Sequence, residues 1–213
     1  MSPGLARLRA DDNSLVDRAR AMSRSGGRVL LGITGPPASG KSTLAVRVAA
    51  AVGDTAVVVP MDGYHLHDDE LARVGLSDRK GAPETFDVAG YAALLRRLRR
   101  ETDHAVYAPE FDRSREESVA GAIGVHPWHR LVITEGNYLL LDSPGWTDVL
   151  PLLDETWYVE VDDDLRRERL VERHIANGRS PDDALQWTNM SDQANAEIVA
   201  RTRKVADILV DID

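Results

Sequence analysis

The eight residues GPPASGKS, from Gly35 to Ser42, constrain this chain more than any other feature. They complete the pattern G-x-x-x-x-G-K-[ST] and come directly after the apolar run Val29–Ile33. A buried strand that leads through such a glycine-rich turn into a helix aims backbone N–H groups at phosphate oxygens. The sequence therefore predicts a phosphate-binding loop between a buried strand and a helix that begins at Lys41.

Short apolar runs alternate with helical patterns along the rest of the chain. We expect strands over 28–34, 55–60, 130–134, 155–161 and 207–210, and helices over 41–52, 88–100, 163–176, 181–188 and 191–204. Strands that are apolar on both faces and separated by helices are typical of a parallel sheet covered on both sides. The predicted fold is an α/β, doubly wound, mostly parallel five-stranded sheet, preceded by a helix over 12–22 and a linker over 23–27.

Length and composition limit what such a chain can be. With 213 residues we expect a single domain over 1–213, and we leave open whether it is a monomer or a homodimer. The net charge of −9 argues against a partner nucleic acid, because phosphate backbones attract cationic surfaces. No 18-residue apolar run or signal-peptide core is present, so we expect no membrane span and a cytoplasmic location.

Two carboxylates follow predicted strands. Asp62 comes after the run 55–60, and Glu135 comes after the run 130–134, each with a glycine next to it. Ligands of doubly wound sheets bind outside the carboxyl ends of the strands, so both acids should face the crevice that holds the phosphate loop. Each acid could instead close or cap a turn, which is a common structural role for Asp and Glu.

These residue types suit phosphoryl transfer from ATP with Mg²⁺, which needs cradled phosphates, a held metal ion and an aligned acceptor oxygen. Lys41 would bind phosphate, Ser42 would ligate Mg²⁺ with Thr43 behind it, and Glu135 would hold the metal directly or through water. Asp62 would accept the proton of the acceptor hydroxyl. The expected nucleotide-binding residues are Gly35, Pro36, Ala38, Ser39, Gly40, Lys41, Ser42 and Thr43.

An arginine stripe follows the fourth predicted strand. Arg166, Arg169 and Arg173 have the spacing of one helix face, and Arg179 comes just beyond the turn Asn177-Gly178. A helix–turn–helix with such a stripe, over about 163–190, has the form of a lid that closes on ATP and stabilises the transferring phosphoryl group. The alternative is a solvated face paired with neighbouring glutamates. We expect Arg169 or Arg173 to reach phosphate.

An ordered set of motifs resembles a known family. GPPASGKS, MDGYH (61–65), KGAPETFD (80–87), YAPEFDR (107–113) and TEGNYLLLD (134–142), followed by the arginine segment, are similar to the uridine kinase, phosphoribulokinase and bacterial pantothenate kinase group. The resemblance covers roughly 29–210. It implies a nucleoside-kinase-like P-loop NTPase fold and ATP-dependent transfer to a small hydroxyl acceptor, with the roles just given for Lys41, Ser42, Asp62 and Glu135.

The acceptor itself stays open. The resemblance implies that Tyr64, His65, Tyr107, Arg113 and Asn137 line its pocket. Lys80 could receive an anionic group of the acceptor, or it could be a solvated loop residue. The stretch 79–83 reads RKGAP, where uridine kinases carry an aspartate for the ribose, so a nucleoside, a sugar and a pantothenate-like acceptor all remain possible. A nucleotide-hydrolysing switch is the alternative from another class, although the chain has no N-K-x-D motif.

Overall fold

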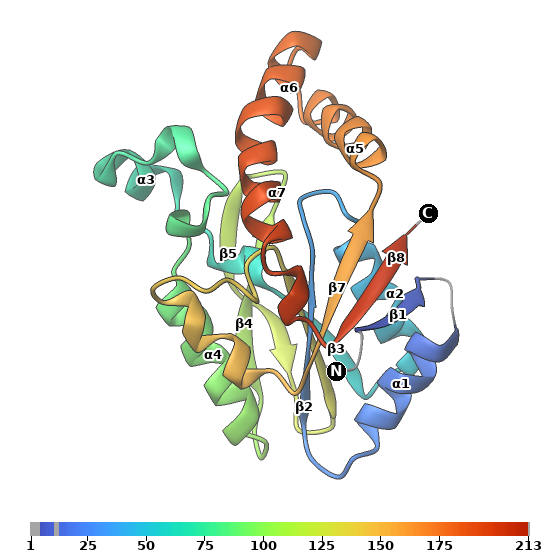
Figure 1. Ribbon diagram of the computed structural model, residues 1–213. Coiled ribbons are helices and arrows are strands. Elements are labelled where there is room, and N and C mark those ends of the chain that lie inside the picture. The colour runs from blue at the N-terminus through green and yellow to red at the C-terminus, as the bar shows by residue number, and fades with distance from the viewer. Residues whose placement is uncertain (1–4, 11–12, 213) are drawn as a thin grey trace.

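A six-stranded parallel sheet forms the centre of the protein, in the spatial order β1-β8-β7-β2-β6-β3 (Figure 1). The structure, a computed structural model, describes residues 5–10 and 13–212. The strands are β1 (Ala6–Arg9), β2 (Val29–Thr34), β3 (Ala56–Pro60), β6 (Leu131–Gly136), β7 (Glu155–Val161) and β8 (Ile208–Ile212). This arrangement confirms the predicted α/β, mostly parallel fold, with one strand more than the five expected.

Helices cover both faces of the sheet (Figure 1). They are α1 (Asn13–Ser23), α2 (Lys41–Val52), α3 (Asp68–Val74), α4 (Val88–Arg100), α5 (Asp163–Ala176), α6 (Pro181–Trp187) and α7 (Gln193–Ala200). The predicted start of the first helix, at residue 12, lies outside the described residues. None of the helices within the described ranges has the length and apolarity that crossing a bilayer requires.

The two faces of the sheet carry separate apolar cores. Side chains alternate along a strand, so Leu30 and Leu31 of β2 point to opposite sides. Leu30 joins a core that includes Leu95 of α4, whereas Leu31 joins a second core that includes Val48 of α2. All four residues are fully buried. Burial on both faces explains why the central strands read as continuous apolar runs.

A two-stranded antiparallel hairpin was absent from the predicted elements. It comprises β4 (Val106–Asp112) and β5 (Glu117–Val125). Val106, Ala108 and Val125 are buried in the same core as α4. The opposite end of the hairpin lies close to the short 3₁₀ turn Met61–Tyr64 that follows β3.

The segment after β7 forms a helical extension above the sheet (Figure 1). Helices α5 and α6 contact each other, and α6 continues into α7 through a π-helical turn, Thr188–Asp192. The sequence predicted two separate helices, 181–188 and 191–204. The backbone instead stays helical through the π turn, which inserts an extra residue into the ladder and changes the face that later side chains present.

Candidate functional site

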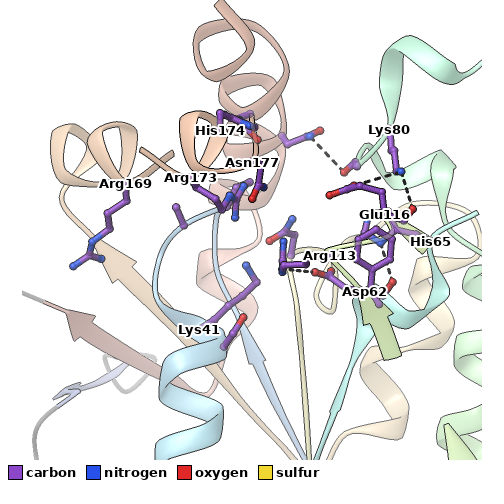
Figure 2. Close-up of a pocket in the computed structure, with 18 of the residues that line it drawn as sticks. Lys41, Asp62, His65, Lys80, Arg113, Glu116, Arg169, Arg173, His174 and Asn177 are labelled. Carbon is purple, nitrogen blue, oxygen red and sulfur yellow. Dashed lines mark hydrogen bonds and ion pairs between the residues drawn. The ribbon is translucent and has the colours of Figure 1, made fainter. Parts of the chain in front are cut away.

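A cavity of about 1360 Å³ opens where β2, β3 and β6 end (Figure 2). It has two ends of different chemistry. The loop end contains Lys41, Ser42, Arg169 and Arg173, and the hairpin end contains Asp62, His65, Lys80, Arg113 and Glu116. Single-ligand pockets span roughly 300–1,000 Å³, so this cavity has room for two small molecules side by side.

The phosphate-loop sequence lies where the motif predicts, between β2 and the first turn of α2. Gly40 has a positive φ of 89°, and an added Cβ would come within 2.8 Å of Ile212 Cδ1, so the last turn of the loop requires glycine. Of the predicted loop residues, the cavity wall includes Ala38, Gly40, Lys41, Ser42 and Thr43. Gly35, Pro36 and Ser39 do not line the wall. Ser39 is fully buried, with an unpartnered Oγ.

Lys41 is the first residue of α2 and points into the cavity (Figure 2). Burial lowers the pKa of its amine, while the nearby Glu135 and Asp62 carboxylates act in the opposite direction. Anions are stabilised at a helix N-terminus, and the loop adds backbone donors at the same place. The loop end can therefore bind phosphate groups.

Ser42 and Glu135 lie together at the same helix start. Ser42 Oγ donates a hydrogen bond to Glu135 Oε1 at 2.9 Å, and Glu135 lies behind Ser42 with 5% of its surface exposed. Burial raises the pKa of Glu135, and the charge of Lys41 opposes this shift. A hydroxyl beside a buried carboxylate, next to a phosphate site, fits the ligands that Mg²⁺ uses with phosphate oxygens and water.

Asp62 is held between the sheet and the hairpin. It lies in the 3₁₀ turn after β3, where Arg113 Nη2 contacts Asp62 Oδ2 at 3.2 Å. An added Cβ on Gly63 would come within 2.4 Å of the Pro109 carbonyl oxygen. The glycine therefore permits the close approach of β4 that brings Arg113 to Asp62. The carboxylate faces the cavity opposite Lys41 (Figure 2).

The hairpin end continues with His65 and Lys80. The His65 ring lies 4.0 Å from the ring of Phe86 and 4.8 Å from that of Phe111, and its Nδ1 is 2.9 Å from the Asp62 carbonyl oxygen. Burial lowers the pKa of His65. Lys80 Nζ contacts Asp68 Oδ1 at 2.7 Å. Asn137, after β6, also lines the cavity and has a buried, unpartnered Oδ1.

The structure does not place two predicted acceptor residues in the cavity. Tyr64 packs its ring 5.4 Å from that of Tyr91 in the core, and burial raises the pKa of Tyr64 to about 12. Tyr107 is 59% exposed because strand alternation directs it away from the buried Val106 and Ala108. Neither tyrosine belongs to the site proposed below.

The arginine stripe divides into two parts. Arg169 and Arg173 line the loop end. Arg166 is only 1% exposed and turns away, with Nη2 donating to Gln193 Oε1 at 2.6 Å and Nε donating to Asp163 Oδ1 at 2.9 Å. The contact with Gln193 therefore directs Arg166 toward α7 although its spacing places it on the same helix face. Burial lowers the pKa of Arg173, which the Asp192 carboxylate opposes.

Several residues that line the cavity were not predicted from the sequence. His174 Nε2 lies 2.7 Å from Asp192 Oδ2, and both side chains are about nine-tenths buried. Glu116, at the hairpin tip, contacts Lys80 and has a positive φ of 55°. The sequence carries no signal for these pairs, because 18 residues and a π turn separate the first pair and 36 residues separate the second.

The sequence of this chain is similar to those of known proteins. Residues 30–212 match the model of the phosphoribulokinase / uridine kinase family. A protein of Schizosaccharomyces pombe named "Putative uridine kinase C227.14" is 35% identical over 209 residues, which cover 93% of this chain and 89% of that protein.

Solved structures of other proteins share the fold of this chain. A structure described as a "putative fructose transport system kinase" from Silicibacter sp. TM1040 is 40% identical, with a TM-score of 0.83, and the match covers 92% of this chain and 98% of that chain. YFH7 from Saccharomyces cerevisiae, 16% identical with a TM-score of 0.81, shares the fold over 94% of this chain and 98% of its own. The chain therefore belongs to the phosphoribulokinase / uridine kinase family of P-loop kinases.

Proposed function

We propose that this protein transfers the γ-phosphoryl group of ATP to a hydroxyl of a nucleoside or sugar acceptor. One observation carries the proposal. The Asp62 carboxylate shares a cavity with Lys41 and Arg173, close enough for its charge to oppose the lowering of both pKa values that burial causes. A base opposite a phosphate site is the arrangement that transfer to a hydroxyl requires.

ATP would occupy the loop end. The backbone N–H groups of the loop and the Lys41 ammonium would bind the β- and γ-phosphates. Arg169 and Arg173 of α5 line the same end, so they would offset the charge on the transferring group from the opposite side. Mg²⁺ held by Ser42 and Glu135 would neutralise charge that develops on the phosphate oxygens.

The acceptor would lie at the hairpin end with its hydroxyl against Asp62. Arg113 contacts Oδ2 of this carboxylate, which leaves Oδ1 for the acceptor. As the acceptor oxygen bonds to the γ-phosphorus, its proton passes to Asp62, and the bond between that phosphorus and the β–γ bridging oxygen breaks to release ADP.

Arg113 would keep the Asp62 carboxylate oriented for this step, because Nη2 holds Oδ2 at 3.2 Å. The close approach of β4 at Gly63 fixes Arg113 relative to Asp62. The base would therefore be positioned before the acceptor arrives.

A coupled assay of ADP release tests the proposal, with nucleosides, free sugars, pantothenate and phosphorylated sugars as acceptors. Asp62→Asn should lower turnover by about 10²–10⁴ with the best acceptor, because the amide cannot take the proton, while ATP binding stays nearly unchanged. Asp69→Asn is the matched control, since Asp69 lines the same cavity with a 96% exposed side chain. Equal turnover in the wild-type protein and Asp62→Asn would remove Asp62 from this role.

The same assay separates a kinase from a nucleotide-hydrolysing switch. A switch would release ADP as fast without acceptor as with any member of the panel. A kinase should show acceptor-dependent release well above the rate in buffer. Hydrolysis alone, unchanged by every acceptor, would contradict the proposed transfer.

A further inference from the structure

The cations at the two ends of the cavity differ in their partners. Lys41, Arg169 and Arg173 at the loop end form no ion pair with a carboxylate among the residues that the structure describes. Unpaired cations in a partly buried cavity are poised to receive an anionic ligand. The loop end is therefore built for phosphate groups.

At the hairpin end, Lys80 already has carboxylate partners. Nζ of Lys80 lies 2.7 Å from Asp68 Oδ1 and 3.5 Å from Glu116 Oε2, and it donates a hydrogen bond to the Glu116 carbonyl oxygen at 3.1 Å. Its side chain is 20% exposed. The neighbouring Arg79 is also occupied, with Nη2 at 2.6 Å from Glu84 Oε1.

The other basic groups at this end are no freer. Arg113 pairs with Asp62, and the lowered pKa of His65 favours its neutral form. Among the described residues that line the hairpin end, the carboxylates are Asp62, Asp68, Asp69 and Glu116 and the cations are Lys80 and Arg113. The hairpin end thus carries a net charge of −2 with both cations paired.

We infer that the acceptor is an uncharged polyhydroxy compound and that compounds bearing a phosphate or carboxylate are excluded. This inference rests on the proposed function, because it names the acceptor of that same site. An anionic group would have to displace carboxylates from Lys80 or Arg113 and then face the carboxylates it displaced. A neutral polyol can instead donate hydroxyl hydrogen bonds to the same carboxylates.

Lys80 has a structural role in this scheme. Its contacts join three separate segments, because Asp68 begins α3, Lys80 precedes the 3₁₀ turn Pro83–Thr85, and Glu116 lies at the hairpin tip. All three residues line the hairpin end of the cavity. Lys80 therefore holds the three segments together beside the acceptor site and does not act as an anion receptor.

Matched pairs of acceptors give the first test. The ADP-release assay compares a free sugar with its phosphate ester, a nucleoside with its monophosphate, and pantothenol with pantothenate. In any pair that reacts, kcat/KM should favour the neutral member by at least about tenfold. Preference for the anionic member would overturn this inference and leave the kinase proposal intact. Failure of every compound to raise ADP release above the buffer rate would overturn the kinase proposal.

Inorganic phosphate gives a second test that needs no known acceptor. Thermal unfolding is followed with saturating non-hydrolysable ATP analogue and Mg²⁺, so that the loop end is filled, and phosphate is then added. The wild-type protein should gain no further stabilisation. Asp68→Asn/Glu116→Gln should gain a phosphate-dependent rise in Tm, because Lys80 is released from its carboxylate partners. A rise in the wild-type protein that disappears in Lys80→Gln would show that Lys80 receives anions and would overturn the inference.

Discussion

Replacing Glu135 by glutamine should raise the stability of the free protein and reduce the further stabilisation that nucleotide gives. Glutamine keeps an oxygen that can accept the 2.9 Å hydrogen bond from Ser42 but carries no charge. An ion buried without a close ion-pair partner costs several kcal/mol, and the Ser42 hydrogen bond and the attraction of Lys41 offset most of this cost. We expect the free variant to be about 1–2 kcal/mol more stable, which raises Tm by about 2–8 °C for a chain of this size.

The nucleotide-dependent gain in stability should shrink by a similar amount, so the two complexes should unfold at nearly the same temperature. Without the carboxylate, Mg²⁺ has one ligand of the pair left, so ATP·Mg²⁺ should bind at least about tenfold more weakly. At saturating nucleotide a tenfold loss of affinity removes about 1.4 kcal/mol of ligand-linked stabilisation. The assay is thermal unfolding of both proteins, with and without ATP analogue and Mg²⁺, at one protein concentration.

Glu110→Gln is the control for this experiment. Glu110 is an exposed glutamate on β4, so its substitution should leave both Tm values within about 1 °C of the wild-type values. If Glu135→Gln lowered the Tm of the free protein and left the nucleotide-dependent rise intact, Glu135 would be a structural hydrogen-bonding group and not a metal ligand. That result would refute the reasoning about the metal site.

Two further predictions concern the helical extension after β7 and the hairpin. His174→Leu should lower the free energy of unfolding, measured in urea, by about 2–3 kcal/mol, because it leaves Asp192 buried without a partner. His174→Gln should recover most of this loss, because the amide can donate a hydrogen bond to Asp192. Equal losses in both variants would contradict a role for this hydrogen bond. Tyr107→Ala should leave the acceptor KM unchanged within about twofold, because the side chain points to solvent, and a large rise in KM would return Tyr107 to the acceptor site.

The central part of the fold could be read from the sequence because it depends on local patterns. The predicted bounds of α2, α4, α5 and β7 agree with the structure, since each combines a clear period with a nearby turn or cap. β1 was not predicted, because its sequence, Ala-Arg-Leu-Arg, becomes a strand only by pairing with β8. β5 escaped because its glycines weaken the strand signal.

The residues of the site also divide into those that sequence patterns predict and those that they do not. Lys41, Ser42, Asp62 and Glu135 could be found because strand ends of a parallel sheet meet at one edge, so their order along the chain fixes their neighbourhood. Partners of cations depend on tertiary contacts that no local pattern encodes. The ion pair between Lys80 and Glu116 joins two loops, and Arg166 turns to α7 although its spacing matches Arg169 and Arg173.

The most direct test follows the γ-phosphoryl group itself. Phosphorus NMR of a reaction that contains ATP, Mg²⁺ and the best neutral acceptor shows whether the group ends on the acceptor or in water. The proposed function predicts a new phosphate-ester resonance in step with ADP for the wild-type protein, and a loss of that signal by about 10²–10⁴ in rate for Asp62→Asn. Inorganic phosphate as the sole product, at the same rate in both proteins, would contradict it.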